Sequence, residues 1–107
     1  MAINGWRVIA VYDCPMTERE ERREYTIFRK MLLQENFFRL QYSLYVRHFP
    51  TMAVAEATIQ RIRSNIPSGA QVAFFLVTDK QYAMTREFFG QQPTRKKPNQ
   101  PEQVELF

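Results

Sequence analysis

The aspartate at position 13 is the side chain in this sequence best placed to do chemistry. It ends the apolar run Trp6–Asp13 (WRVIAVYD) directly before Cys14 and Pro15, where a side chain projects from a rigid strand end. An aspartate there also commonly caps its own turn, and that alternative stays open. One carboxylate is a poor Mg²⁺ site, because Mg²⁺ takes near-octahedral oxygen coordination. Two copies of Asp13 facing each other across a two-fold axis would share an ion, and a metal-activated water would suit phosphodiester hydrolysis.

Other reactive side chains offer less. His48, the only histidine, follows Arg47 at a predicted strand end and is expected to be structural or on the surface. Ser43 and Cys14 have no identifiable base partner, which a nucleophile requires. Asp79 is expected to be a turn residue at the end of a strand. The chain has only three glycines and no phosphate-cradling glycine motif.

Positive charge is concentrated in the middle of the chain. The net charge is +4 with a sequence pI of about 9.5, and arginine supplies eleven of the 15 basic residues. Residues 36–78 contain a single acid and four arginines: Arg39, Arg47, Arg61 and Arg63. The strand arginines Arg39 and Arg47 have no acid near them in sequence, so we expect them to lack internal partners. Doubled in a dimer, they would form a two-sided basic surface suited to a duplex backbone.

Arg19 and Arg22 are further candidates for nucleic-acid contact, since they fall in the first turns of a predicted helix close to Asp13. They alternate with glutamates, and the competing interpretation is an ordinary solvated helix face. The aromatic content invites a base-stacking interpretation as well. Core packing is the better explanation for Phe37, Phe38, Phe74 and Phe75.

The elements that position these residues can be read along the chain. After the strand Trp6–Asp13, Thr17 and Glu20 have the spacing of a capping box that opens a helix. That helix should end near Glu35, with Asn36 as a left-handed cap. The stretch 37–49 is rich in aromatic and β-branched residues, and we divide it near Tyr42 into two strands, one bent strand with a bulge being the alternative.

A second helix and a fourth strand complete the pattern. The helix should begin at Pro50-Thr51 and run to about Ile66, and the strand covers residues 71–77. A weaker apolar segment over 83–89 is a candidate short fifth strand. The order strand–helix–strand–strand–helix–strand predicts an α+β, ferredoxin-like sandwich with an antiparallel sheet and both helices on one face.

The strand composition indicates a homodimer. In this fold the face without helices is bare, and its residues should be polar. The runs VIAVY (residues 8–12) and VAFFLV (72–77) are apolar on both faces. Leaving Phe74 or Phe75 in water would forgo roughly 2 kcal/mol of burial each. A second copy of the sheet is the simplest cover, and a loop or the C-terminal tail folded over the face is the alternative.

The totals limit the class of protein. At 107 residues the chain fits one domain, assigned to 1–90, followed by a polar, flexible tail over 91–107. No apolar run is long enough for a membrane helix, and no signal peptide is apparent. Cys14 is the only cysteine, which fits a reducing compartment, and we expect a cytoplasmic protein. The apolar tail residues Val104, Leu106 and Phe107 are expected to bind a partner, a frayed terminus being the alternative.

Four stretches of the sequence resemble the CRISPR-associated "Cas two" family: VIAVYDCP, YTIFRKMLL, NFFRLQYSLYVRH and VAFFLVTDKQY. The resemblance covers the chain from Trp6 to Gly90, and LQYSLYVRH and the strand-ending YD are its most specific parts. The tail is similar to that of members from type II CRISPR systems. Asn36 stands where glycine is usual, and Cys14 stands where a small or apolar residue is usual. Neither departure affects the metal hypothesis.

The resemblance implies a ferredoxin-like homodimer that binds duplex DNA and bridges two dimers of the CRISPR integrase during spacer acquisition. It also implies that Asp13 is an Mg²⁺ ligand and the catalytic residue of an endonuclease acting on RNA or DNA, with single-stranded RNA as one substrate. Two functions therefore stand side by side, a structural adaptor and a metal-dependent nuclease. A ligand-binding regulatory module is a third, and the arginine excess and missing glycine loops weigh against it.

Overall fold

The structure is a computed structural model that describes residues 5–90, and these residues form four strands and three helices. In chain order the elements are β1 (Trp6–Asp13), α1 (Arg19–Gln34), β2 (Phe38–Gln41), β3 (Leu44–Phe49), α2 (Met52–Arg63), β4 (Gln71–Thr78) and α3 (Asp79–Tyr82).

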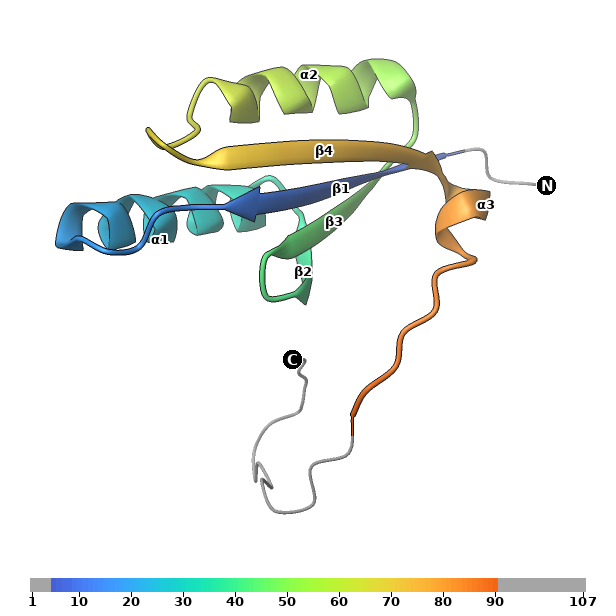
Figure 1. The fold of residues 1–107 in the computed structure, drawn as a ribbon. Coiled ribbons are helices and arrows are strands. Elements are labelled where there is room, and N and C mark those ends of the chain that lie inside the picture. The colour runs from blue at the N-terminus through green and yellow to red at the C-terminus, as the bar shows by residue number, and fades with distance from the viewer. Residues whose placement is uncertain (1–4, 91–107) are drawn as a thin grey trace.

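The strands form one antiparallel sheet in the order β2-β3-β1-β4, with β1 between β3 and β4. Together with the element order, this arrangement confirms the predicted ferredoxin-like fold. Helix α2 packs against β1 and β3, and in Figure 1 the chain turns away from the strands after α3. The C-terminal end of β1, which carries Asp13, lies beside the start of β4.

Both long helices pack on one face of the sheet. Alternate residues of β1, Val8 and Ala10, are fully buried, as period-two alternation requires. They share a core cluster with Phe28 of α1 and Ile62 of α2. Tyr45 of β3 is fully buried in the same cluster. The prediction that both helices cover one face is therefore confirmed.

The N-terminal end of α1 differs from the prediction, whereas its C-terminal end agrees with it. Glu18, not Thr17, is the N-cap residue, and the Glu21 carboxylate accepts hydrogen bonds from the backbone amides of both Thr17 and Glu18. The predicted pairing of Thr17 with Glu20 is wrong by one residue, because the acid-rich start offers the same spacing twice. At the other end Asn36 has φ 68°, the left-handed conformation expected of it.

The middle of the chain splits where the sequence predicts. Tyr42 and Ser43 separate β2 from β3, and the register between them shifts around Arg39 and Gln41. Thr51 is the N-cap of α2, its hydroxyl accepting a hydrogen bond from the Val54 amide. This helix ends at Arg63 rather than near Ile66. Ile66 precedes Pro67, and a proline ring disfavours helical backbone at the residue before it.

The predicted fifth strand over 83–89 is absent from the described residues. The chain instead turns into α3, whose first turn is closed by reciprocal hydrogen bonds between Thr78 and Gln81. Residues 85–90 are irregular and exposed. A strand requires a neighbour to satisfy its backbone groups, and this segment pairs with none of the four strands; its last residues, 87–90, only line a pocket with residues 39–42 at the β2 edge of the sheet. The tail assigned to 91–107 lies outside the described residues.

No helix within residues 5–90 has the length and apolar character needed to cross a membrane.

Candidate functional site

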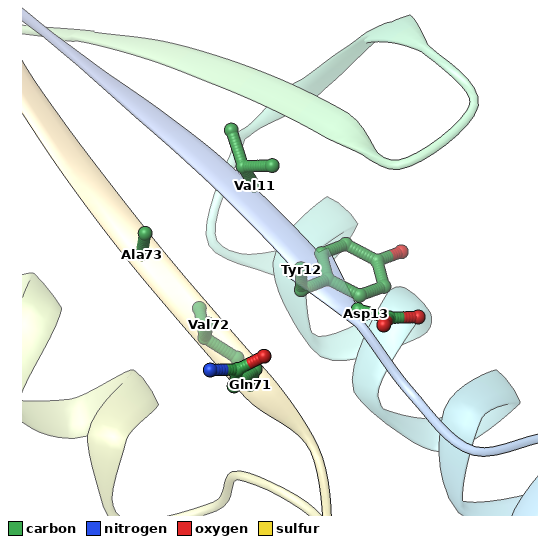
Figure 2. Close-up of a pocket in the computed structure, with 6 residues that line it drawn as sticks. All are labelled: Val11, Tyr12, Asp13, Gln71, Val72 and Ala73. Atoms are coloured by element: carbon green, nitrogen blue, oxygen red, sulfur yellow. The ribbon is translucent and has the colours of Figure 1, made fainter.

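Asp13 lies at the C-terminal end of β1, as predicted, and its side chain is exposed. It lines a pocket of about 290 Å³ with its neighbours on β1 and with the first residues of β4. The lining residues, drawn in Figure 2, are Val11, Tyr12, Asp13, Gln71, Val72 and Ala73. In the β1–β4 register Asp13 stands directly opposite Gln71, at the end where the two strands separate.

The Asp13 carboxylate forms no hydrogen bond or ion pair with any described residue, so nothing in residues 5–90 supports the turn-capping alternative. Its neighbours are poor candidates for proton transfer or attack. Burial raises the pKa of the Tyr12 hydroxyl far above its ordinary value, so that hydroxyl stays protonated. Burial, and then the Asp13 charge, raises the pKa of the Cys14 thiol, which disfavours the nucleophilic thiolate. Asp13 is therefore the one anionic group of this pocket.

The Mg²⁺ implied by the resemblance can be tested against these residues. Residues 5–90 hold no group of three or more histidine, cysteine, aspartate or glutamate side chains that could hold a metal ion. One exposed carboxylate is a sparse donor set that would hold only a hydrated ion, since Mg²⁺ commonly keeps several waters and binds through one or two carboxylates and substrate phosphates. The donor chemistry thus suits a solvated ion held at few points, not one enclosed by the protein.

The face of the sheet opposite α1 and α2 is apolar in its middle, where Val46 is fully buried but two phenylalanines stay about half-exposed. Cross-strand partners share a face, so Ile9 of β1 lies with Val46 and Phe75, and Val11 lies with Ala73. Phe75 remains 55% exposed and Phe38 of β2 47%. We call this the open face. Helix α3 covers the open face only at the end near Arg7. The described residues therefore do not bury Phe75 and Phe38, and the cover that the sequence indicates is incomplete.

The arginines predicted to bind nucleic acid fall into two groups. Arg19 is exposed and forms no ion pair in the described part of the chain, whereas Arg22 donates hydrogen bonds to the carbonyls of Met16 and Thr17. Arg22 therefore holds the loop between Asp13 and α1. Neither arginine lines the Asp13 pocket.

Arg47 does have an internal partner, and the expectation that it lacks one is wrong. Its Nη1 donates to the Glu35 carbonyl at 2.7 Å and lies 3.8 Å from the Glu35 carboxylate. The guanidinium also lies over the Phe49 ring, 4.2 Å from its centre. Glu35 stands one residue before the acid-poor segment 36–78, and the reversal of the chain at Asn36 brings it back to β3.

The same carboxylate neutralises a second central arginine. Arg61 of α2 donates two hydrogen bonds to Glu35, of 2.8 and 3.0 Å. The hydrogen bonds from Arg61, with the charges of Arg61 and Arg47, hold the pKa of Glu35 below its ordinary value despite some burial. Arg39 alone among the strand candidates stays without an ion pair in residues 5–90, its guanidinium 5.1 Å from the centre of the Tyr42 ring.

A second polar cluster was not foreseen from the sequence. Asp79, expected to be only a turn residue, accepts a hydrogen bond from Arg7 Nε at 3.0 Å and lies 3.0 Å from His48 Nε2. Its amide donates to the carbonyl of Gly5, and Arg7 also lies over the Tyr82 ring. These contacts tie α3 to β1 and β3. His48 is thus structural, as expected, but its partner is 31 residues away and no local pattern identifies it.

The described residues form a small ferredoxin-like protein with an exposed carboxylate at a strand end. Residues 6–85 match the family described as CRISPR associated protein Cas2. The chain therefore belongs to the Cas2 family, which confirms the resemblance seen in the sequence.

Individual relatives agree. The chain is 36% identical to a CRISPR-associated endoribonuclease Cas2 from Flavobacterium psychrophilum, over 94% of this chain and 86% of the relative. A protein of the same name from Parvibaculum lavamentivorans is 36% identical, over 94% of this chain and 98% of the relative. Another, from Ligilactobacillus salivarius, is 43% identical over 71% of this chain and 75% of the relative.

Proposed function

We propose that this chain acts as a homodimeric, DNA-binding adaptor in CRISPR spacer acquisition, with a second copy covering the open face. The observation that carries the proposal is the exposure of Phe75 and Phe38 on a sheet whose other face packs against α1 and α2. Contiguous exposed apolar surface of this kind marks interaction sites, and a two-fold pair buries the same surface on both partners.

Light scattering on the full chain tests the dimer. Phe75→Glu places a charge on the open face and should convert a dimer into a monomer, because an unpaired charge in an apolar interface is strongly unfavourable. Ala57→Glu adds the same charge on the exposed surface of α2 and should leave the mass unchanged. A wild-type monomer at micromolar concentration would remove the dimer from the proposal.

Two of the predicted arginines remain suited to contact phosphate. Arg19 and Arg39 are exposed and unpaired with acids in the described residues, and pairing of two chains would present each of them twice. Arg22 and Arg47 are engaged with their own chain, so we expect smaller contributions from them. The proposed ligand is duplex DNA, and single-stranded RNA is the competing one.

Fluorescence anisotropy over a salt series measures this contact. Arg39→Ala should weaken duplex binding and lower the slope of log K against log salt by about 0.9 for each phosphate that the arginine side chain neutralises in the wild type. Arg23→Ala serves as the control, since Arg23 is already paired with Glu20. An unchanged slope in Arg39→Ala would assign duplex binding to other residues.

The partner in this proposal is the CRISPR integrase, whose two dimers the homodimer would bridge. Val104, Leu106 and Phe107, which lie outside the described residues, are the proposed attachment points. Removal of residues 104–107 should weaken integrase binding in calorimetry while the chain still dimerises.

A metal-dependent endonuclease is the second candidate function. It is favoured by the relatives named endoribonucleases and by the exposed carboxylate of Asp13, which has no partner in residues 5–90. Asp13 would hold the ion, and Mg²⁺ there would supply an activated water and neutralise phosphate charge. The role of this chain would be to hold that ion beside the phosphate backbone of a bound nucleic-acid strand.

Asp13→Asn separates the two functions, because it removes the charge and keeps the shape of the side chain. The adaptor predicts that cells carrying this variant still acquire spacers, whereas an essential nuclease predicts that acquisition is lost. Sequencing of the expanded array in cells provides the measurement. Duplex binding by the purified variant shows that the protein remains folded.

A further inference from the structure

Gln71 is the residue directly opposite Asp13, and the adaptor and nuclease proposals give it no role. The two residues are register partners on β1 and β4, so their side chains share a face, with Cβ atoms about 4.5–5.5 Å apart in such pairs. Both side chains are exposed and line the same pocket (Figure 2). The pocket therefore contains two polar groups from two neighbouring strands.

Neither polar group has a partner in the described part of the chain. The Asp13 carboxylate and the Gln71 amide make no hydrogen bond with each other or with any other residue in 5–90. The adjacent pair on the same face, Val11 and Ala73, is apolar and offers no competing donor or acceptor. Any ligand of this pocket would therefore meet one negative charge and one neutral amide.

This combination selects for a hard cation. A carboxylate oxygen and an amide carbonyl are both ligands that Mg²⁺ and Ca²⁺ take in proteins, with water in the remaining positions. A free anion would be repelled by Asp13, and no described arginine lines the pocket to offset that charge. A bound cation would therefore favour the approach of a phosphate group.

We propose that Gln71 is a second oxygen ligand of a hydrated divalent cation held by Asp13, its amide carbonyl facing the ion. The inference rests on the Asp13 site of the nuclease proposal and adds to it a residue from β4. Because β4 contributes Gln71, the site would span two strands, and the position of the ion would be fixed by the β1–β4 register.

Binding of Mn²⁺, used as a spectroscopic substitute for Mg²⁺, provides the test without any measurement of cleavage. Titration of the full chain by electron paramagnetic resonance gives the affinity for wild type and each variant. Gln71→Glu adds a second carboxylate to the pocket and should tighten Mn²⁺ binding about tenfold, since ligand charge sets the affinity of such sites. Gln71→Ala should weaken it several-fold. Gln41→Glu makes the same charge change on β2, at the opposite edge of the sheet, and should have no effect.

Thermal unfolding adds a second measurement, because a carboxylate placed beside Asp13 should change the stability in a way that a charge far from the pocket would not. Two carboxylates directly opposite each other on neighbouring strands repel, so Gln71→Glu should lower the melting temperature in EDTA. Saturating Mn²⁺ should restore it, because a ligand that binds only the folded state stabilises that state.

The outcomes distinguish this inference from the site on which it rests. Weaker binding in Asp13→Asn, with tighter binding in Gln71→Glu, supports both. Loss in Asp13→Asn with no change in Gln71→Glu and Gln71→Ala overturns the role of Gln71 and leaves the Asp13 site standing. Equal binding in Asp13→Asn and wild type overturns both.

Discussion

The two faces of the sheet are formed by alternate residues of the same strands, and several of their apolar side chains differ strongly in exposure. On one face Val8 and Ala10 are fully buried beneath α1 and α2. On the other Val11 is 36% exposed and Phe75 is 55% exposed. In the middle of the sheet both faces are apolar, and the polar residues of the open face, such as Arg7 and Asp13, lie at its ends, so in the middle the difference lies in the cover. Strands that are apolar on both sides therefore indicate that both faces of the sheet require cover, and the helices cover only one of them.

The largest expected effect comes from neighbouring phenylalanines on opposite faces. Phe74 packs against the core cluster and Phe75 faces outward, so the same substitution tests both environments. Phe74→Ala should lower the free energy of unfolding by about 3 kcal/mol, as truncation of a core phenylalanine does. Phe75→Ala should cost the isolated chain less than about 1 kcal/mol and act mainly on self-association.

Urea unfolding at nanomolar and at high micromolar protein concentration measures these changes. The cost of Phe75→Ala should grow with protein concentration, whereas the cost of Phe74→Ala should hardly change. Equal losses for both variants in the dilute protein would show that the chain covers its open face by itself.

A second comparison concerns the two ends of β1, where one aspartate is paired and the other is not. Asp79 contacts both Arg7 and His48 and fixes α3, whereas Asp13 has no partner in residues 5–90. Asp79→Asn should therefore cost about 1–2 kcal/mol of stability, less than a fully buried charge pair because the cluster is partly exposed.

Asp13→Asn provides the matched control and should change the free energy of unfolding by less than about 0.5 kcal/mol. Both variants can be followed by denaturant unfolding at neutral pH. A large loss in Asp13→Asn would indicate a structural role for this carboxylate and would weaken its assignment as a metal ligand.

The smallest expected effect concerns Glu35, which joins Arg47 of β3 to Arg61 of α2. The pKa of Glu35 is lowered in the folded state. The ionised carboxylate therefore stabilises the protein at pH values above 4.5, the ordinary pKa of a glutamate. That contribution is lost as the pH falls through the lowered folded pKa. Glu35→Gln should cost roughly 1 kcal/mol at pH 7, since Arg61 is largely exposed.

The pH dependence of the difference between wild type and Glu35→Gln isolates this group from the other acids. The two proteins should differ at pH 7 and approach each other as the pH falls below 4.5. Added salt should reduce the difference at neutral pH. A difference that does not depend on pH would assign the loss to packing instead of charge.

Local chemistry predicted the fold more completely than it predicted the polar contacts. The end of α1 at Asn36 and the division of 37–49 follow from backbone preferences of a few adjacent residues, and both are confirmed. The cap of α1 was displaced by one residue because Thr17 and Glu18 each precede a glutamate by three positions.

The contacts of Arg47 and Asp79 depend instead on residues that only the folded chain brings together. The acid that binds Arg47 comes from the end of α1, and the arginine that binds Asp79 is 72 positions away. Charge counted along a segment cannot detect such pairs. Asp13 was identifiable because its position depends only on the strand that it ends, while the register that sets Gln71 beside it is a property of the sheet.

Gly5 shows how tightly one end of this sheet is assembled. A side chain at this position would collide with the imidazole of His48 and the carboxylate of Asp79, which already fill the space beside the backbone. Even a methyl group would have to displace groups from two separate elements. In a saturation mutagenesis experiment, substitutions at position 5 should therefore act by moving His48 and Asp79 out of their ion pair, although glycine itself contributes no side chain to any interaction.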